Sequence, residues 1–322
     1  MKSLKLINGN LEIINAQKPV LEGFGAIIKV IGCGLCGSDI VKIREKDDSA
    51  ILGHEVVGEI VEINTKTDFK KGDIVVISHH YPCGTCEYCT RKSYSMCRFF
   101  KSTNLFPCGF SEYLYASEGH LEHTTFRVPS GFKYDHIAFL EPLACCIRAV
   151  ERADLIKGAN TLTLGLGSIG LLMAQASKNF GYNSYGFDID SSRQEQALNY
   201  DIKFDENIKY DAIFMTSGSH HAIPTALKYV RDGGKIIVFS SVKGDFGYTN
   251  NDIYYRELSV IASYSPSVDN LKTSYKMITQ GKINLDNIST TYNFEDIKKA
   301  LEDTTSGKIY KAYIELWIKW KQ

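Results

Sequence analysis

Hydrophobic and polar residues alternate over much of the first third of the chain, a pattern typical of half-buried strands. Short stretches of this kind occur within 4–30 and at 56–63, 73–78, 110–116 and 126–128. Residues 79–108 lack periodicity and are rich in Cys, Tyr, Lys and Ser. Because a loop of that length usually has a functional or metal-bound reason to stay ordered, we expect a β-rich region that carries one special loop.

The pattern changes after Pro129. Residues 135–153 have helical spacing, which we expect Pro142 to interrupt. From residue 160 onward, short apolar runs alternate with amphipathic segments, which predicts a parallel sheet covered by helices on both faces. Further segments are predicted as helices near 267–281 and 294–305 and as a strand at 311–318.

Length and charge narrow the class of protein. The 322 residues suggest about two domains. The 37 basic and 37 acidic side chains cancel, so no general attraction to nucleic acid or a membrane surface is expected. We see neither a signal peptide nor an apolar run near 18 residues. These features predict a cytoplasmic protein whose nine cysteines bind metal or do chemistry rather than form disulfides.

A glycine-rich motif marks a candidate nucleotide site. Residues 165–170 read GLGSIG, between an apolar strand and an amphipathic helix. Gly165 would allow the tight turn, Gly167 the close approach of a pyrophosphate, and Gly170 the packing of helix on strand. The new helix, which begins around Ser168 and Ile169, would offer free N–H groups to the phosphates.

An acidic residue follows at the spacing expected for dinucleotide binding. Asp188 ends the next strand, 18 residues after Gly170. A carboxylate there accepts hydrogen bonds from the adenosine ribose and repels a 2′-phosphate, which favours NAD over NADP. Arg193 lies nearby and would either meet a 2′-phosphate or remain a solvated helix residue.

Four cysteines in the long loop form a strong metal-binding pattern. Cys83, Cys86, Cys89 and Cys97 have the spacing C-x2-C-x2-C-x7-C. Four thiolates satisfy a tetrahedral zinc completely and leave no open position. An iron–sulfur cluster is the chemical alternative. Since a closed site cannot activate water or substrate, catalysis must take place elsewhere.

Other motifs carry metal ligands of mixed type. The groups are Cys36, Ser38 and Asp39 in GLCGSD, His54 and Glu55 in LGHEVVGE, and Glu141 in LEPLA. Thiolate, imidazole and carboxylate together suit a zinc ion that keeps a position for substrate. Such a zinc lowers the pKa of a bound alcohol, and Ser38 would pass the hydroxyl proton onward.

Together these motifs resemble the zinc-dependent medium-chain dehydrogenases, most closely the sorbitol, polyol-phosphate and threonine dehydrogenase branch. GLCGSD, LGHEVVGE, KKGD, CGTCEYC, GFSEY, LEPLA and GLGSIG occur in that family's order over nearly the whole chain. The resemblance implies an α/β fold with a GroES-like β-rich catalytic domain and an inserted Rossmann domain with a doubly wound parallel sheet. We expect the catalytic domain at 1–138 and 286–322 and the NAD-binding domain at 139–285.

The resemblance also implies roles for individual residues. The catalytic-zinc cysteine and histidine fall on Cys36 and His54, and either Glu55 or Glu141 completes the zinc shell. The proton-relay hydroxyl falls on Ser38. The structural-zinc cysteines fall on the four in the long loop, which gives two zinc ions per chain. Relatives are commonly homodimers or homotetramers.

The chain departs from the family pattern at three places. Only 17 residues separate Cys36 from His54, and residues 40–51, directly after the GSD triplet, contain no histidine. Arg148 stands where many relatives have histidine, and would either neutralise a phosphate or pair within its helix. Cys33 forms a local C-x2-C with Cys36, for which a redox pair is the alternative to zinc binding.

The expected function is oxidation of a secondary alcohol in a polyol, a sugar alcohol or its phosphate, with NAD as hydride acceptor and NADP as the less favoured cofactor. Two alternatives remain at this point. One is a threonine or amino-alcohol dehydrogenase with the same machinery. The other is a catalytically silent zinc-binding redox sensor, which the shortened loop and the additional cysteines suggest.

Overall fold

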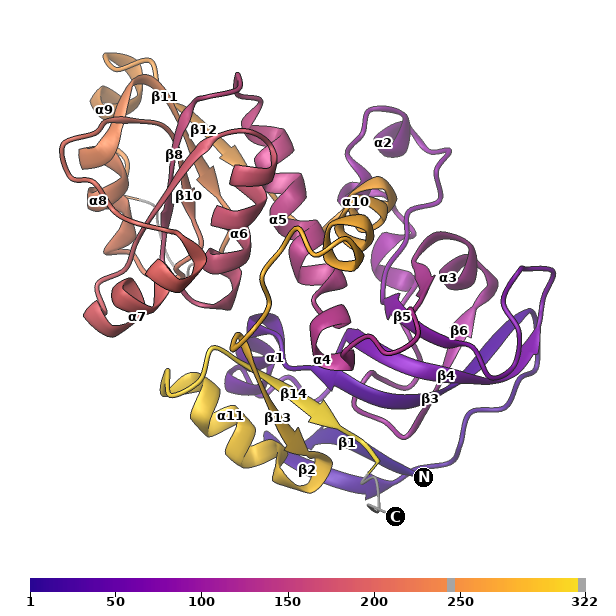
Figure 1. The fold of residues 1–322 in the computed structure, drawn as a ribbon. Coiled ribbons are helices and arrows are strands. Elements are labelled where there is room, and N and C mark those ends of the chain that lie inside the picture. Colours follow the sequence, from indigo (N-terminus) through magenta and orange to yellow (C-terminus); the bar gives the residue numbers. More distant parts are fainter. Residues whose placement is uncertain (242–246, 318–322) are drawn as a thin grey trace. The chain divides into compact units, whose positions relative to one another are not determined.

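The computed structural model describes residues 1–241 and 247–317, and their helices and strands are labelled in Figure 1. These residues form two compact units. Unit 1 comprises Met1–Glu141, Ser267–Gln280 and the segment that begins at Leu285, and unit 2 comprises Pro142–Pro266 and Gly281–Asn284. Unit 2 is therefore inserted into the sequence of unit 1.

Unit 1 is built on a seven-stranded sheet. Its strand order is β13-β14-β3-β4-β5-β7, with β6 also paired to β3. The strands are β3 (Gly25–Gly34), β4 (Glu55–Asn64), β5 (Ile74–Ser78), β6 (Tyr113–Ser117), β7 (Thr125–Arg127), β13 (Ser289–Asn293) and β14 (Lys311–Glu315). All neighbours are antiparallel except β13 and β14. A hairpin of β1 (Lys2–Ile7) and β2 (Asn10–Asn15) lies outside this sheet.

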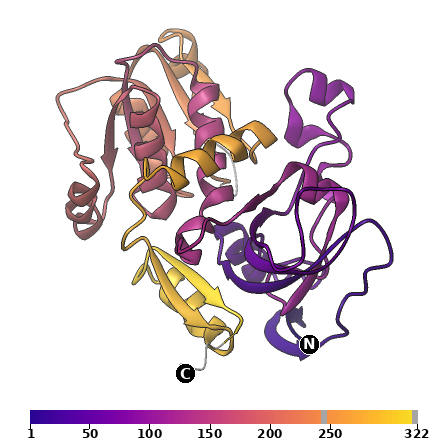
Figure 2. The same cartoon turned by 45° about the vertical axis from the view of Figure 1, so that its right-hand side comes forward.

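An apolar core and several short helices stabilise unit 1. Buried Ile28, Val56, Ile77, Phe110 and Ile314 belong to one core cluster. Helix α11 lies beside β13 and β14 (Figures 1 and 2). The helices are α1 (Gly37–Arg44), α3 (Glu118–His123), α4 (Tyr134–Ile137), α10 (Val268–Thr279) and α11 (Ile297–Thr305), with η4 (Phe294–Asp296) before the last. The long loop contains α2 (Glu87–Thr90), η1 (Tyr94–Met96) and η2 (Phe100–Ser102).

Unit 2 contains a five-stranded sheet with the order β12-β11-β10-β8-β9. Every neighbouring pair is parallel, and the buried residues come from apolar runs such as that of β10. The strands are β8 (Asn160–Leu164), β9 (Asn183–Phe187), β10 (Tyr210–Met215), β11 (Val230–Val238) and β12 (Ser259–Ala262). The helical segments are α5 (Leu140–Ala153), α6 (Ser168–Asn179), α7 (Ser191–Gln196), η3 (Ala197–Tyr200), α8 (Ala222–Tyr229) and α9 (Asn250–Tyr254).

The structure confirms the expected fold class, an antiparallel GroES-like sheet together with a parallel Rossmann-type sheet. The segment 135–153 is interrupted as expected, since α4 ends at Ile137 and α5 begins at Leu140, but Pro142 lies in the first turn of α5 rather than at the break itself. A proline costs little there, since its missing N–H has no helical acceptor. The end of the strand predicted at 311–318 lies outside the described residues. No helix in 1–241 or 247–317 is long and apolar enough to cross a membrane.

Candidate functional site

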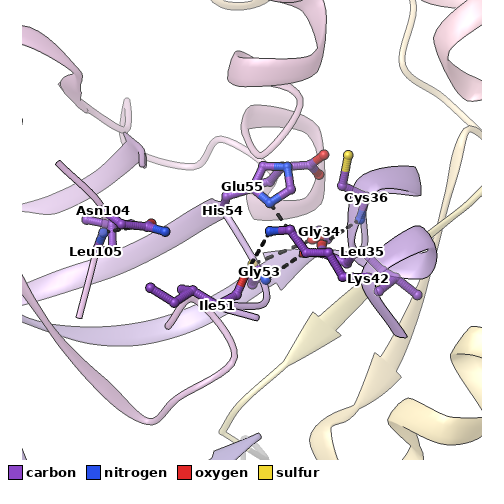
Figure 3. Close-up of polar contacts among 12 residues, drawn as sticks. Gly34, Leu35, Cys36, Lys42, Ile51, Gly53, His54, Glu55, Asn104 and Leu105 are labelled. Atoms are coloured by element: carbon purple, nitrogen blue, oxygen red, sulfur yellow. Dashed lines mark hydrogen bonds and ion pairs between the residues drawn. The ribbon is translucent and has the colours of Figure 1, made fainter. Parts of the chain in front are cut away.

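Strand pairing in unit 1 gathers three of the predicted metal ligands. Cys36 is the N-cap of α1, just after β3, while His54 and Glu55 lie at the start of β4. The two strands pair antiparallel with Gly34 opposite Glu55. This register brings together the thiol of Cys36, the imidazole of His54 and the carboxylate of Glu55, whose ligand atoms lie within 4.8 Å of one another (Figure 3).

The chemistry of this group fits a zinc ion. Soft thiolate, imidazole and carboxylate are the donor types of zinc sites that retain an open position. His54 and Glu55 are buried. Oε2 of Glu55 lies 2.7 Å from Nζ of Lys311, so this carboxylate already has a cationic partner. The fit to zinc is therefore carried by the donor types and their proximity.

Asp39 holds two of these ligands in place. Its Oδ2 accepts a hydrogen bond from the backbone N–H of Cys36 at 3.2 Å, and its Oδ1 accepts one from Gly53 at 3.0 Å. Nδ1 of His54 lies 3.5 Å from Oδ1. Burial lowers the pKa of His54, but the carboxylate of Asp39 and the thiolate of Cys36 raise it well above its ordinary value. An Asp39–His54 contact through Nδ1 leaves Nε2 to bind metal.

Asp39 is named above among the candidate ligands of GLCGSD, whereas in the structure it lies beside the ligand group and contacts His54. We expect Asp39→Asn to lower the zinc affinity of the Cys36–His54 group about 10- to 100-fold, because a neutral amide orients the imidazole less well. Competition with a zinc chelator measures the change. Asp48→Asn is the control, since that exposed carboxylate caps Asn8 and Gly9 away from the ligands. Equal zinc affinity in both variants contradicts the assigned role.

Lys311 occupies the other side of the ligand group. It lies on β14, and its Nζ donates to Oε1 of Glu55 at 2.7 Å and to the carbonyl of Leu35 at 3.3 Å. Both side chains are buried, at 6% and 0% exposure. Although burial lowers the pKa of Lys311, Glu55 and then Cys36 raise it, and the net pKa lies above the ordinary value. No sequence motif predicts this pair, because its members are 256 positions apart.

The glycine at position 34 makes room for that ion pair. A Cβ atom there would lie 1.9 Å from Oε2 of Glu55. Any side chain at this position would therefore displace the carboxylate from the ligand group.

Glu141 and Ser38, the other residues predicted to act in catalysis, are not part of this ligand group. Glu141 is buried in the first turn of α5 and contributes to the raised pKa of Lys311. Among the described residues, Glu141 is not part of the group whose ligand atoms lie within 4.8 Å. Ser38 is exposed on α1, two positions after Cys36. Its predicted proton transfer therefore stays a prediction.

The four cysteines of the long loop form a second group. One Sγ from each lies within 4.8 Å of the others, and three Sγ–Sγ distances are 3.5, 3.5 and 4.0 Å. A tetrahedron with zinc–sulfur bonds of 2.3 Å has edges of about 3.8 Å. All four cysteines are free, and buried Phe100 packs against them. The group thus fits a closed structural zinc site.

Zinc binding should stabilise this loop. We expect Cys97→Ser to lose one zinc per chain and to be cleaved by protease within 83–104 on the order of tenfold faster, because local opening costs less free energy. Mass spectrometry of the fragments and a metal assay measure both effects. Cys145→Ser, a half-buried cysteine of unit 2, is the control. Unchanged zinc content in Cys97→Ser contradicts the assignment.

In unit 2, the glycine-rich motif has the backbone that a dinucleotide requires. Gly165 has φ of +95°, and a Cβ at Gly170 would lie 1.8 Å from the carbonyl oxygen of Gly165. At Gly167 the nearest atom to an added Cβ is Nη1 of Arg193, 3.8 Å away. Helix α6 begins at Ser168, followed by Ile169, with no side-chain cap. Its free N–H groups therefore fit a phosphate group.

Asp188 and Arg193 lie beside this motif. Oδ2 of Asp188 accepts a hydrogen bond from the backbone of Leu166 at 2.6 Å, and Oδ1 accepts one from Asp190 at 3.0 Å. The carboxylate is thus fixed next to the glycine-rich turn. The guanidinium of Arg193 reaches Gly167, so both charges expected to influence the choice between NAD and NADP are placed at the motif.

Two of the departures noted in the sequence have structural explanations. Nη1 of Arg148 donates to the carbonyl of Ser265 at 2.9 Å, so this arginine connects two segments of unit 2. Cys33 is fully buried, and burial raises its pKa well above the ordinary value. A thiol in that state is a poor nucleophile, which disfavours a redox pair with Cys36.

Unit 1 carries a thiolate–imidazole–carboxylate group and a four-cysteine group, and unit 2 carries a glycine-rich nucleotide cradle. These features define a metal- and dinucleotide-dependent oxidoreductase. Residues 24–126 match the family model for the alcohol dehydrogenase GroES-like domain. A sorbitol dehydrogenase from Halalkalibacterium halodurans is 30% identical, with 95% of this chain and 96% of the relative covered. The chain belongs to the zinc-dependent medium-chain dehydrogenase family and is an oxidoreductase of the alcohol dehydrogenase type.

Other relatives have similar extents. A D-arabitol-phosphate dehydrogenase from Enterococcus avium is 27% identical, with 95% of this chain and 94% of that protein covered. A crystal structure from Escherichia coli, described as an oxidoreductase/dehydrogenase of unknown specificity involved in membrane biogenesis, is 26% identical. It superposes with a TM-score of 0.85 over 99% of this chain and 100% of that one.

Proposed function

We propose that this protein oxidises a secondary alcohol of a polyol, or of a polyol phosphate, and transfers the hydride to NAD. The observation that carries the proposal is the convergence of Cys36, His54 and Glu55. The glycine-rich turn of unit 2 supports a dinucleotide as the second reactant. The names of the sorbitol and D-arabitol-phosphate relatives support the substrate class.

Each residue of the catalytic site has a role in the proposed reaction. Cys36 and His54 bind the catalytic zinc, and Glu55 or Glu141 completes its shell. When bound, zinc supplies Lewis-acid chemistry that lowers the pKa of the substrate hydroxyl. Asp39 orients His54, and Ser38 accepts the hydroxyl proton and passes it to water, because residues 40–51 contain no histidine to receive it.

We assign the catalytic domain to residues 1–138 and 286–322 and the NAD-binding domain to 139–285. In this proposal the Cys83–Cys97 loop holds a second, structural zinc, and the protein is a cytoplasmic homodimer or homotetramer. Asp188 favours NAD, because a carboxylate at the end of the second strand repels a 2′-phosphate.

A substrate panel tests the function. The zinc-loaded protein should reduce NAD with sorbitol, xylitol or a pentitol phosphate, and its kcat/KM with NAD should exceed that with NADP. A protein that reduces NAD only with threonine is instead an amino-alcohol dehydrogenase. A fully zinc-loaded protein that reduces neither cofactor with any of these alcohols contradicts the proposal and favours a silent zinc-binding protein.

A further inference from the structure

Next to the ligand group, an additional histidine remains without a task. Glu55 pairs with Ser78 in the antiparallel register of β4 and β5. His54 precedes Glu55 and His79 follows Ser78, so the two histidines lie side by side on neighbouring strands. Their ring centroids are 4.6 Å apart, and His80 continues the row with its ring 3.9 Å from that of His79.

The backbone at His79 is firmly held. Its carbonyl accepts a hydrogen bond from Nε2 of His120 at 3.0 Å. Two residues on, the backbone N–H and carbonyl of Tyr81 both bond the hydroxyl of Thr103, at 3.1 and 3.2 Å. These hydrogen bonds hold the backbone, and the rings of His54 and His80 pack against the ring of His79 before any ligand binds, as a recognition group requires.

The ring itself is left unpaired. Neither nitrogen of His79 has a hydrogen-bond partner among residues 1–241 and 247–317, and its Nδ1 is buried. Burying an unpaired ring nitrogen costs less free energy when that nitrogen carries no proton. The proton of the neutral His79 ring is therefore placed on Nε2. Because the residue is partly exposed, the edge that carries Nε2 is the one open to a ligand. Nε2 donates in the neutral and in the charged ring alike.

We propose that Nε2–H of His79 binds the hydroxyl next to the reacting carbinol, so that this residue selects vicinal diols over simple secondary alcohols. The inference rests on the proposed function, because it places the reacting oxygen at the Cys36–His54 group. The hydroxyl on the adjacent carbon lies close to the reacting oxygen, so a donor beside a metal ligand can bind it, and the ring centroid of His79 is 4.6 Å from that of His54. His79 is thus a specificity residue that contacts the substrate.

The neighbouring histidine gives a matched control. His80 also has a buried Nδ1 without a hydrogen-bond partner. Its ring contacts Phe100 at 5.0 Å, on the far side of His79 from His54. A substitution at His80 therefore perturbs the same row of rings without removing the proposed donor.

The test compares 2,3-butanediol with 2-butanol, which differ by one hydroxyl. In His79→Phe the ratio of kcat/KM for the diol to that for the mono-alcohol should fall roughly tenfold, the effect of losing one neutral hydrogen bond. His79→Gln, which keeps an N–H donor, should restore most of the ratio, and His80→Phe should leave it unchanged. A ratio that stays the same in His79→Phe, or falls equally in His80→Phe, overturns the proposal.

A binding measurement separates this inference from the proposed function. Titration calorimetry measures the binding of xylitol to the zinc-loaded protein and does not require turnover. We expect the Kd for xylitol to rise roughly tenfold in His79→Phe and to stay constant in His80→Phe. If the unmodified protein oxidises neither butanol compound, the result counts against the proposed function. The titration still tests whether His79 contributes to binding of the polyol. Equal xylitol affinity in both variants, or no binding to the unmodified protein, overturns the assignment of His79.

Discussion

Cys36→Ser should abolish most of the activity while leaving the fold intact. We expect the unmodified protein to hold two zinc ions per chain and the variant to hold one, since only the mixed-ligand group loses its thiolate. Lewis-acid stabilisation of the alkoxide contributes several kcal/mol to the barrier, so kcat/KM should fall on the order of a thousandfold or more. Metal analysis and steady-state kinetics with the best polyol measure both effects.

A nearby cysteine provides the control for this experiment. Cys33→Ser removes a buried thiol three positions away that is not part of the ligand group. It should retain two zinc ions and most of the activity. The complementary variant Cys97→Ser should also retain one zinc, but at the catalytic group. If Cys36→Ser keeps both ions, or if Cys33→Ser loses activity equally, the thiolate of Cys36 is not the catalytic ligand.

Much of the fold could be predicted because the relevant patterns are local. The apolar run of β8, the glycine-rich turn and the amphipathic α6 are contiguous, and the structure places them as expected. Strand β12 was not predicted, because its four residues are largely exposed and show no alternation. Pro142 located the break in 135–153 only approximately, because a proline is tolerated in the first turn of a helix and the break lies just before that turn.

The site shows the same division between local and long-range features. The four cysteines of the long loop could be identified from their spacing, and Cys36, His54 and Glu55 from short motifs that resemble those of the dehydrogenase family. By contrast, Lys311 and His79 act through strand pairing, β14 with β3 and β5 with β4, respectively. Pairing register is a property of the whole sheet, and no motif in the sequence encodes which histidine or lysine it brings beside a metal ligand.

Lys311→Met should cause the largest loss of stability of any single substitution in unit 1 considered above. The variant leaves the carboxylate of Glu55 buried without its cation, and breaking a buried pair in this way costs about 3–5 kcal/mol. Urea unfolding of the zinc-free protein measures the change. Lys2→Met is the control, because the Lys2–Glu295 pair has a comparable 2.6 Å distance but is about half exposed, at 48% and 52%. Because solvent screens an exposed pair, Lys2→Met should change the free energy of unfolding far less than Lys311→Met.

The dependence on pH and a double variant identify the cause. The raised pKa of Lys311 means that its contribution is fully present below the ordinary value of 10.5 and is lost only as the pH rises through the higher value in the folded protein. The difference between Lys311→Met and the unmodified protein should therefore not change as the pH rises from 7 to 9. Adding Glu55→Leu to Lys311→Met should recover most of the loss, because an apolar pair carries no unpaired charge. A double variant as unstable as the single one would show that packing of the lysine chain, and not the charge of Glu55, accounts for the effect.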